Sequence, residues 1–191
     1  MIDKTVLRKA AKGDRRAQFL LYKDVHACLF PVTCRYFSND DERAAALNKG
    51  FMKILDSLKR FLKENDADRF EFWAKRVVIN SCIDELRSQK RIKEQTRTTD
   101  WQEESYMLDD HHVNEAEQKL NAEDLQGILH QLGDTRRAVF NLYAVEGYSH
   151  KEIADKLEIS EDNSRYHLSM ARKDLKSMVI KAMGSLKSFL L

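Results

Sequence analysis

Apolar residues recur every three or four positions in several segments of the chain, which is the spacing of helices that bury one face. The longest such segment follows Ser38 and Asn39, either of which can cap a helix, and it begins with acidic residues that suit the positive end of the helix dipole. Its apolar positions are Ala44, Leu47, Phe51, Ile54, Leu55, Leu58 and Phe61. This pattern predicts one long helix of an all-α fold.

Two further helices are predicted before it. Residues 5–13 place Val6, Ala10 and Ala11 on one side and end at Gly13, a residue type that commonly closes helices. Residues 14–37 predict a longer helix that Pro31 should kink or interrupt, because proline has no backbone N–H. The apolar positions of the longer helix are Phe19, Leu20, Tyr22, Val25, Leu29 and Val32.

The segment 69–95 carries two stripes at helical spacing. One stripe is apolar and predicts docking on neighbouring helices; it consists of Phe72, Ile79, Cys82, Ile83 and Leu86. The other mixes an aromatic ring, an amide and charges, in the order Trp73, Val77, Asn80, Asp84 and Arg87. A mixed surface of this kind suits single-stranded nucleic acid, because bases stack on rings and cations meet phosphates. A packed Trp73 and an Asp84–Arg87 pair within the helix explain the same spacing without a ligand.

The C-terminal part predicts a helix-turn-helix. Residues 122–132 and 134–147 each predict a helix, the second capped by Asp134 or Thr135 and closed by Gly147. Ser149 and Glu152 then form a capping-box pattern, and Ser160 caps a further helix after the short turn 158–160. The buried seam of the last helix is expected at Ser164, Leu168, Ala171, Leu175 and Met178. A short helix, a tight turn and a longer helix are the parts of a helix-turn-helix.

The outer face of the last helix is polar and basic. Such a helix fits the DNA major groove, where its first residues reach base edges. We expect Asn163 to pair with adenine, and Arg165 to contact guanine or phosphate. Phosphates would be neutralised by Arg172, Lys173 and Lys176. The alternative is a helical hairpin in an interaction bundle, with its outer charges merely solvated.

Charge is distributed in blocks, although the net charge of the 191-residue chain is only +2. Basic residues dominate 87–97 and the region after Ser164, whereas nine acids face the single base Lys119 between positions 100 and 124. Basic lobes separated by an acidic strip suggest two binding domains and a linker. We therefore predict two small helical domains joined by a flexible acidic linker, with boundaries at 1–95, 96–115 and 116–191.

Several functional classes are disfavoured by the sequence. No stretch approaches the roughly 20 apolar residues that cross a bilayer, and no signal-peptide pattern is visible, so a cytoplasmic location is expected. Cys28, Cys34 and Cys82 form no CxxC pair and are expected to be buried structural thiols. No nucleophile–base pair, phosphate loop or metal-ligand cluster is recognisable, so we expect no enzyme activity, no metal and no cofactor.

In this order and at these separations, the segments resemble those of the sigma-70 family of RNA polymerase sigma factors, in particular its extracytoplasmic-function group. The resemblance covers nearly the whole chain. "KGDRRAQFLLY" is similar to the opening helix of the family, and "DDERAAALNKGFMKILDSLKRF" to the helix that docks on core polymerase. "FEFWAKRVVINSCIDELRSQKR" resembles the promoter-melting segment, and residues 136–175 resemble the domain that recognises the upstream promoter element.

The resemblance implies a factor that binds core RNA polymerase, directs it to specific promoters and assists promoter opening, with no small-molecule substrate. It implies polymerase contacts at Leu47, Asn48, Phe51, Met52 and Leu55. It implies downstream-element contacts at Trp73, Lys75, Arg76, Asn80, Asp84 and Arg87. The implied upstream-element contacts are Ser160, Asn163, Arg165, Tyr166, His167, Arg172, Lys173 and Lys176. A membrane-linked anti-sigma factor is a further implied partner.

The chain departs from the family pattern at Ala44, Ala45 and Lys49, close to the implied polymerase contacts, where the family often has acids. This departure leaves open a helix-turn-helix regulator that binds promoter DNA without core polymerase. A third possibility is an all-helical interaction module that makes no DNA contact.

Overall fold

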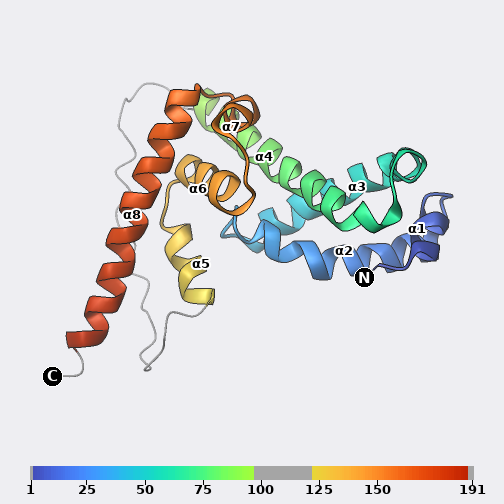
Figure 1. Cartoon of the computed structure of the whole chain (residues 1–191), viewed down its shortest axis with the longest axis horizontal. Coiled ribbons are helices and arrows are strands. Elements are labelled where there is room, and N and C mark those ends of the chain that lie inside the picture. The colour runs from blue at the N-terminus through green and yellow to red at the C-terminus, as the bar shows by residue number, and fades with distance from the viewer. Residues whose placement is uncertain (1, 97–121, 189–191) are drawn as a thin grey trace. The chain divides into compact units, whose positions relative to one another are not determined.

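The computed structural model describes residues 2–96 and 122–188, and side chains within 2–92 and 124–182 (Figure 1). Every regular element in these ranges is helical, which confirms the predicted all-α class. In chain order the elements are α1 (Lys4–Ala10), α2 (Arg15–Thr33), α3 (Asp40–Glu64), η1 (Ala67–Arg69), α4 (Phe70–Thr96), α5 (Ala122–His130), α6 (Asp134–Phe140), η2 (Asn141–Val145), α7 (His150–Leu157) and α8 (Glu161–Ser188). None of these helices, over the described residues, is long and apolar enough to span a membrane.

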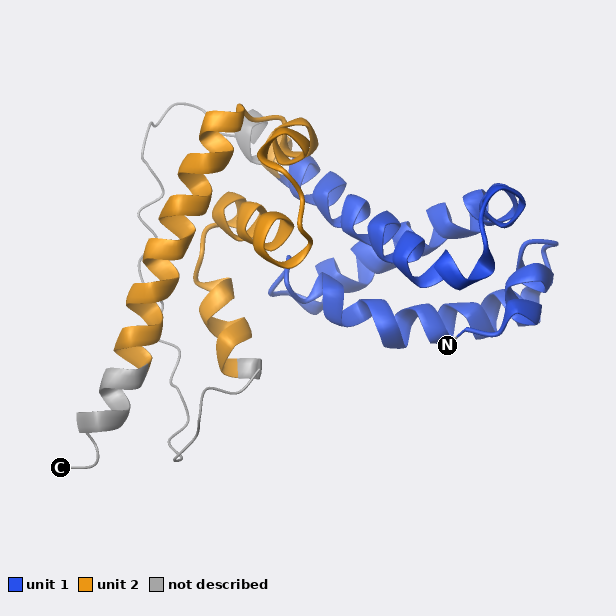
Figure 2. Ribbon diagram, viewed as in Figure 1, with its two compact units in different colours: residues 1–89 blue, residues 90–191 orange. Residues whose placement is uncertain are grey.

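The chain forms two compact units, residues 1–89 and 90–191 (Figure 2). The predicted linker at 96–115 lies outside the described residues, apart from Thr96 at the end of α4.

Unit 1 packs α1, α2, α3 and the first part of α4 around an apolar core. Asn39 caps α3 by accepting a hydrogen bond from the backbone N–H of Asp41, and the first turn is acidic, as predicted. The core includes Leu7, Leu21, Val25, Tyr36, Phe37, Leu47, Ile54, Leu58, Phe61, Phe70 and Ile79. Where α3 meets α4, a Cβ on Gly50 would lie 3.0 Å from Cγ2 of Val78. The close approach of these two helices therefore depends on glycine.

The predicted register of the first two helices is partly wrong. α1 buries Leu7 with Ala10, and Val6 is only half-buried. α2 buries Ala17, Leu21, Val25, Leu29 and Val32, while Phe19 and Leu20 lie on its exposed side. A run of apolar residues at successive positions fits more than one helical face, so the periodicity alone did not distinguish them.

Two local predictions in α2 and its surroundings also need correction. Pro31 does not interrupt α2, which continues to Thr33 before it ends. Of the three cysteines only Cys82 is buried; Cys34 is half-buried and Cys28 is exposed. Burial raises the pKa of the Cys82 thiol to about 12, so this thiol stays protonated at neutral pH.

Unit 2 contains α5, α6, η2, α7 and α8. Its core includes Ile128, Leu132, Ala138, Val139, Leu142, Ile153, Leu168 and Ala171. The predicted side-chain cap of α6 is absent, because Gly133 occupies the N-cap position. Asp134 instead pairs with the buried Arg137 at 2.7 Å, and Arg137 also donates to the backbone carbonyl of Leu132. Gly147, with φ +75°, follows η2 and ends this segment as predicted.

Candidate nucleic-acid interface

The predicted helix-turn-helix is present in unit 2 as α7, the turn 158–160 and α8. Ser149 and Glu152 form the predicted capping box, in which each side chain bonds the other residue's backbone N–H. Ser160 caps α8 by accepting a hydrogen bond from the backbone N–H of Asn163 at 3.1 Å. Glu158 closes α7 in the left-handed conformation, with φ 55°, a geometry that usually favours glycine. The connection between the two helices thus takes only three residues.

The two helices are joined through a polar contact beneath the turn. Ser164 is fully buried in the first turns of α8, and its Oγ lies 2.9 Å from Nδ1 of His150 at the start of α7. Leu168 and Ala171 continue the buried seam, while Leu175 and Met178 are half-buried. The predicted seam is therefore confirmed, and it fixes which face of α8 points outward.

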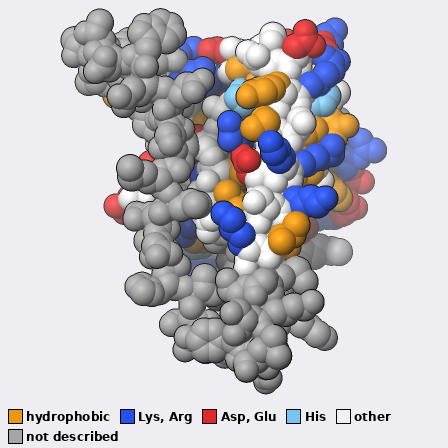
Figure 3. All heavy atoms as spheres, turned by 90° about the vertical axis from the view of Figure 1, so that its left-hand side faces the viewer, with side chains coloured by type: hydrophobic (Ala, Val, Ile, Leu, Met, Phe, Trp, Pro, Cys, Tyr) orange, Lys and Arg blue, Asp and Glu red, His pale blue; other side chains and the backbone are white. Residues whose placement is uncertain are grey.

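The exposed side of α8 carries most of the predicted upstream contacts. Figure 3 shows this side of the molecule, where Lys and Arg side chains are interspersed with apolar ones. The exposed predicted residues are Ser160, Asn163, Arg165, Tyr166, Arg172, Lys173 and Lys176. Lysine and arginine on one helix side, with an exposed amide near the helix start, suit contact with phosphates and base edges.

Two of these cations already have partners within unit 2. Arg165 lies 2.9 Å from Glu161 and 3.1 Å from Asp162, so its charge is partly compensated within the first turns of α8. The guanidinium of Arg172 lies over the ring of Tyr143, 5.6 Å from its centroid. These contacts restrict the rotamers of both arginines before any ligand binds.

His167 differs from the other predicted upstream residues, because it is only partly accessible. Burial lowers the pKa of its imidazole from the ordinary 6.5, and the neighbouring Arg136 lowers it further. His167 is therefore neutral at pH 7 and is poorly suited to neutralising a phosphate. Its ring packs edge-on against the exposed Tyr166, with centroids 5.6 Å apart.

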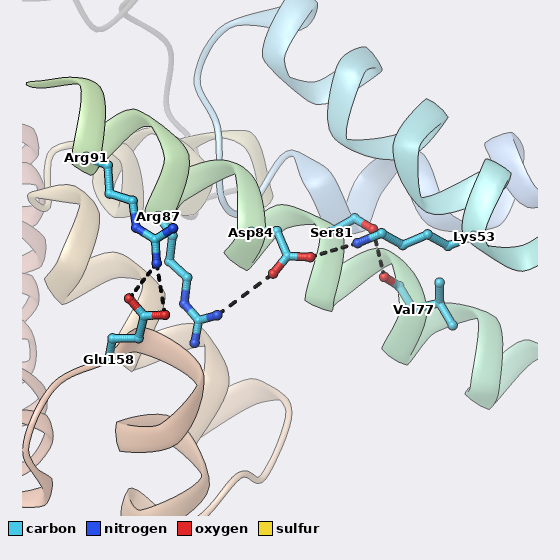
Figure 4. A network of polar contacts seen from close by, with 7 residues as sticks. All are labelled: Lys53, Val77, Ser81, Asp84, Arg87, Arg91 and Glu158. Atoms are coloured by element: carbon cyan, nitrogen blue, oxygen red, sulfur yellow. Dashed lines mark hydrogen bonds and ion pairs between the residues drawn. The ribbon is translucent and has the colours of Figure 1, made fainter.

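In unit 1 the mixed stripe on α4 is largely engaged by neighbouring side chains. Trp73 is half-buried and stacks on Phe61, with centroids 4.4 Å apart and planes 19° apart. Asp84 accepts a hydrogen bond from Lys53 at 2.7 Å and lies 3.9 Å from Arg87 (Figure 4). The structure thus contains a packed Trp73 and an Asp84–Arg87 pair, and the assignment of these residues to the downstream element stays a prediction.

The remaining predicted downstream residues occupy different sides of α4. Arg76 and Asn80 are exposed, whereas Lys75 and Arg87 are half-buried. Nearby Ser81 is buried and donates to the backbone carbonyl of Val77 at 3.1 Å (Figure 4). The exposed surface of α4 thus centres on the arginine and the amide rather than on the tryptophan.

The apolar stripe predicted for α4 contains one wrong member. Phe72 is 78% exposed, whereas the core positions of this helix include Phe70, Ala74 and Val78. Phe70 and Phe72 are separated by one residue. The helical spacing of three or four residues that starts at Phe70, and not the one that starts at Phe72, identifies the buried face. Phe72 is thus a large exposed ring that the sequence pattern assigned to the interior.

Some of the predicted polymerase contacts on α3 are buried and others are exposed. Leu47 is fully buried and Phe51 nearly so, and these two side chains belong to the core of unit 1. Leu55 is half-buried, while Asn48 and Met52 are exposed. Asn48 accepts a hydrogen bond from the Tyr22 hydroxyl at 3.0 Å. A partner that docks on this face of α3 would meet Asn48 and Met52, and it would not meet Leu47.

The described residues hold no cluster of three or more histidine, cysteine or acidic side chains arranged to bind a metal ion. The predicted contact residues that are exposed lie on the surfaces of α3, α4 and α8.

Comparison with known proteins assigns both units. The family domain described as Sigma-70 region 2 matches residues 21–92, and Sigma-70, region 4 matches residues 122–175. Over 185 residues the chain is 22% identical to the ECF RNA polymerase sigma-E factor of Haemophilus influenzae, covering 94% of this chain and 96% of that relative.

Two solved structures are similar to this chain. The sigma factor RpoE of Bartonella quintana, in complex with the anti-sigma factor NepR, is 15% identical with a TM-score of 0.48, over 88% of this chain and 97% of that one. CnrH, in complex with the cytosolic domain of CnrY, is 20% identical with a TM-score of 0.45, over 93% and 96%. With both domain matches in the order that the sequence analysis predicted, this chain belongs to the sigma-70 family of RNA polymerase sigma factors, in the extracytoplasmic-function group.

Proposed function

We propose that this chain binds core RNA polymerase, directs it to specific promoters and assists promoter opening. The observation that carries this proposal is the presence of both region 2 and region 4 in one chain, in that order. A regulator that acts only as a DNA-binding protein needs a helix-turn-helix but has no use for region 2. The chemistry of RNA synthesis belongs to the polymerase, and this chain contributes binding energy and catalyses nothing itself.

The proposed division of labour follows the chemistry of the exposed surfaces. Unit 2 would bind the upstream promoter element as duplex through α8, where Asn163 can reach base edges while Lys173 and Lys176 meet phosphates. Unit 1 would bind the downstream element through α4, where Arg76 and Asn80 are exposed. Core polymerase would contact α3 near Asn48 and Met52. Because the DNA and the polymerase are its ligands, we place its action in the cytoplasm.

The test is in vitro transcription from genomic fragments with purified core polymerase. Core polymerase with this chain should start transcription at a limited set of promoters, and core polymerase alone should not. A variant that combines Arg172→Ala, Lys173→Ala and Lys176→Ala should still bind core polymerase but lose promoter selectivity. A chain that binds DNA without binding core polymerase would overturn the proposal in favour of a simple regulator.

Group membership also supports an anti-sigma factor as a negative partner. We propose that such a protein competes with core polymerase for this chain. The check is co-purification of the tagged chain from cells. We expect to recover a protein that binds the free chain and is absent from the complex of the chain with core polymerase. Recovery of core polymerase as the sole bound protein under both inducing and non-inducing conditions would count against regulation by capture.

A further inference from the structure

The exposed side of α8 carries positive charge that no acid of the described residues balances. Arg172, Lys173 and Lys176 are exposed, and none of them forms an ion pair within the part of the chain that the structure describes. We call these three residues the α8 cations. Asp174, the acid that lies among them in the sequence, is bound instead to Arg136 of α6 at 2.8 Å. Cations three or four residues apart on a helix repel one another, so an anion bound beside them is stabilising.

An acidic segment of the same unit is joined to a helix that packs on α8. Residues 97–121 lead directly into α5, and α5 contacts α8 within unit 2. The cations of this segment are Arg97 and Lys119. Its seven acids are Asp100, Glu103, Glu104, Asp109, Asp110, Glu115 and Glu117. The segment therefore has the charge that complements the α8 cations.

The length of the acidic segment allows it to reach the whole of α8. The 25 residues from 97 to 121 span at most about 80–90 Å. The 28 residues of α8 extend over about 42 Å. Because the segment is joined to α5, its acids are present beside α8 at an effective concentration on the order of millimolar. Exposed ion pairs that would be negligible between separate molecules then become significant.

We propose that the acidic segment 97–121 docks on the α8 cations and competes there with duplex DNA. This inference rests on the proposed function, because it takes α8 as the helix that binds the upstream element. Competition lowers the affinity for every duplex by the same factor, so phosphate contacts alone become too weak to hold the chain. A promoter that adds base contacts with Asn163 still binds, because the segment does not oppose those contacts.

The first measurement is the affinity of the full chain for a duplex of arbitrary sequence, because the proposed competition concerns phosphates. One variant removes three charges from the segment at constant length, by Glu104→Gln, Asp109→Asn and Asp110→Asn. The matched control removes three exposed acids of unit 1, by Asp24→Asn, Asp56→Asn and Glu64→Gln. Both variants change the net charge equally, so a difference between them reports the position of the charges.

The segment variant should bind the duplex about 3- to 150-fold more tightly than the unchanged chain, because three exposed ion pairs no longer compete with the phosphates. The control should gain only the smaller effect of net charge. As the salt concentration rises, screening weakens the ion pairs of the segment, and the difference between the two variants should disappear. Equal gains for both variants at low salt would overturn the inference.

A second measurement locates the contact. Carbodiimide treatment of the free full chain joins a lysine amine to a carboxylate that touches it, and peptide mass spectrometry identifies the pair. Lys173 or Lys176 should be joined to an acid of the segment, and added duplex DNA should suppress this cross-link. A mixture of light and heavy isotope forms distinguishes a contact within one chain from a contact between two copies. Cross-links only between copies, or none at either lysine, would overturn the inference.

The docking and the proposed function fail separately in these experiments. If the cross-links form but core polymerase with this chain starts transcription no more selectively than core polymerase alone, the docking stands and the proposed function fails. If transcription is selective but the cross-links are absent, the proposed function stands and the docking fails.

Discussion

The exposed faces of α4 and α8 differ in how far their charges are compensated within the protein. On α4, Asp84 is bound to Lys53, and the adjacent Glu85 is bound to Lys49. On α8, Lys173 and Lys176 are exposed, and neither forms an ion pair with an acidic side chain of the described residues. The α4 face therefore offers the exposed ring of Phe72 beside Arg76 and Asn80, with acids that are paired with lysines, whereas the α8 face offers lysines without acidic partners among the described residues.

This difference suits two forms of DNA. Duplex DNA has a high density of phosphates, and binding through them releases counterions, which favours an array of lysine and arginine. An unpaired strand exposes base faces, which favours rings at fixed positions. We infer that the affinity of unit 2 for duplex DNA depends strongly on salt concentration. The affinity of unit 1 for an unpaired strand should depend more on how well the bases fit its surface. Variants in each unit can test whether each helix behaves as its surface indicates.

The largest effect on stability is expected for Leu47→Ala. This variant tests whether Leu47 belongs to the core of unit 1 or to a surface that contacts polymerase. Leu47 is fully buried in α3, and removing a buried leucine side chain typically costs about 2–5 kcal/mol of unfolding free energy. Met52→Ala is the control, because Met52 is 57% exposed and should change stability by no more than about 0.5 kcal/mol. Urea unfolding measures both. A Leu47→Ala chain of unchanged stability that cannot bind core polymerase would restore Leu47 as a contact residue.

The second effect concerns the cations of α8. Combining Arg172→Ala, Lys173→Ala and Lys176→Ala should weaken binding to duplex promoter DNA and lower the slope of log affinity against log salt by about 0.9 for each phosphate that is no longer neutralised. The control replaces Lys9, Lys12 and Lys59, exposed residues of unit 1, by alanine and changes the net charge equally. Titrations of the full chain at several salt concentrations measure the slope. Equal slopes for the two triple variants would mean that net charge alone, rather than the α8 face, binds the duplex.

The same two faces show which parts of the site the sequence could predict. The helix-turn-helix was predictable because its determinants are local: the Ser149–Glu152 capping box, the Ser160 cap and a seam with a single possible register. Each of these features lies within a few residues along the chain. Local hydrogen bonding and helical periodicity are therefore sufficient to predict them.

Which residues of α4 and α3 are exposed depends on packing between helices. The sequence pattern does not specify this packing. Phe72 and Trp73 are adjacent aromatic residues, and Trp73 stacks on Phe61 of α3 while Phe72 stays exposed. The ion pair between Lys53 and Asp84 joins residues 31 positions apart. Leu47 was assigned to a partner by family resemblance although its burial fits the periodicity of α3 equally well.

A third prediction compares the stability effects of replacing one glycine in each unit by alanine. A Cβ at Gly50 would lie 3.0 Å from Val78 Cγ2 and 3.2 Å from its Cα, so Gly50→Ala should push α3 from α4 and lose about 1–2 kcal/mol of stability. A Cβ at Gly127 in α5 would meet nothing within 4 Å, so Gly127→Ala should gain about 0.5–1 kcal/mol from helix propensity.

Thermal and urea unfolding of the two glycine variants give the comparison directly. Opposite signs are expected. If Gly50→Ala were stabilising by the same amount as Gly127→Ala, the close contact between α3 and α4 would be wrong.

The smallest effect is a pH dependence at His167, the half-buried member of the otherwise exposed α8 face. Burial and Arg136 lower its folded-state pKa below the ordinary 6.5, so the unfolded chain takes up the proton first as the pH falls. His167 therefore does not reduce the free energy of unfolding above about pH 6.5, and it lowers that free energy as the pH drops below this value towards the folded pKa. His167→Gln, which cannot titrate, should show a smaller loss of unfolding free energy between about pH 7.5 and about pH 5.5 than the unchanged chain. The other histidines titrate in both proteins, so the difference isolates His167. Identical pH profiles would mean that the pKa of His167 is not lowered in the folded chain.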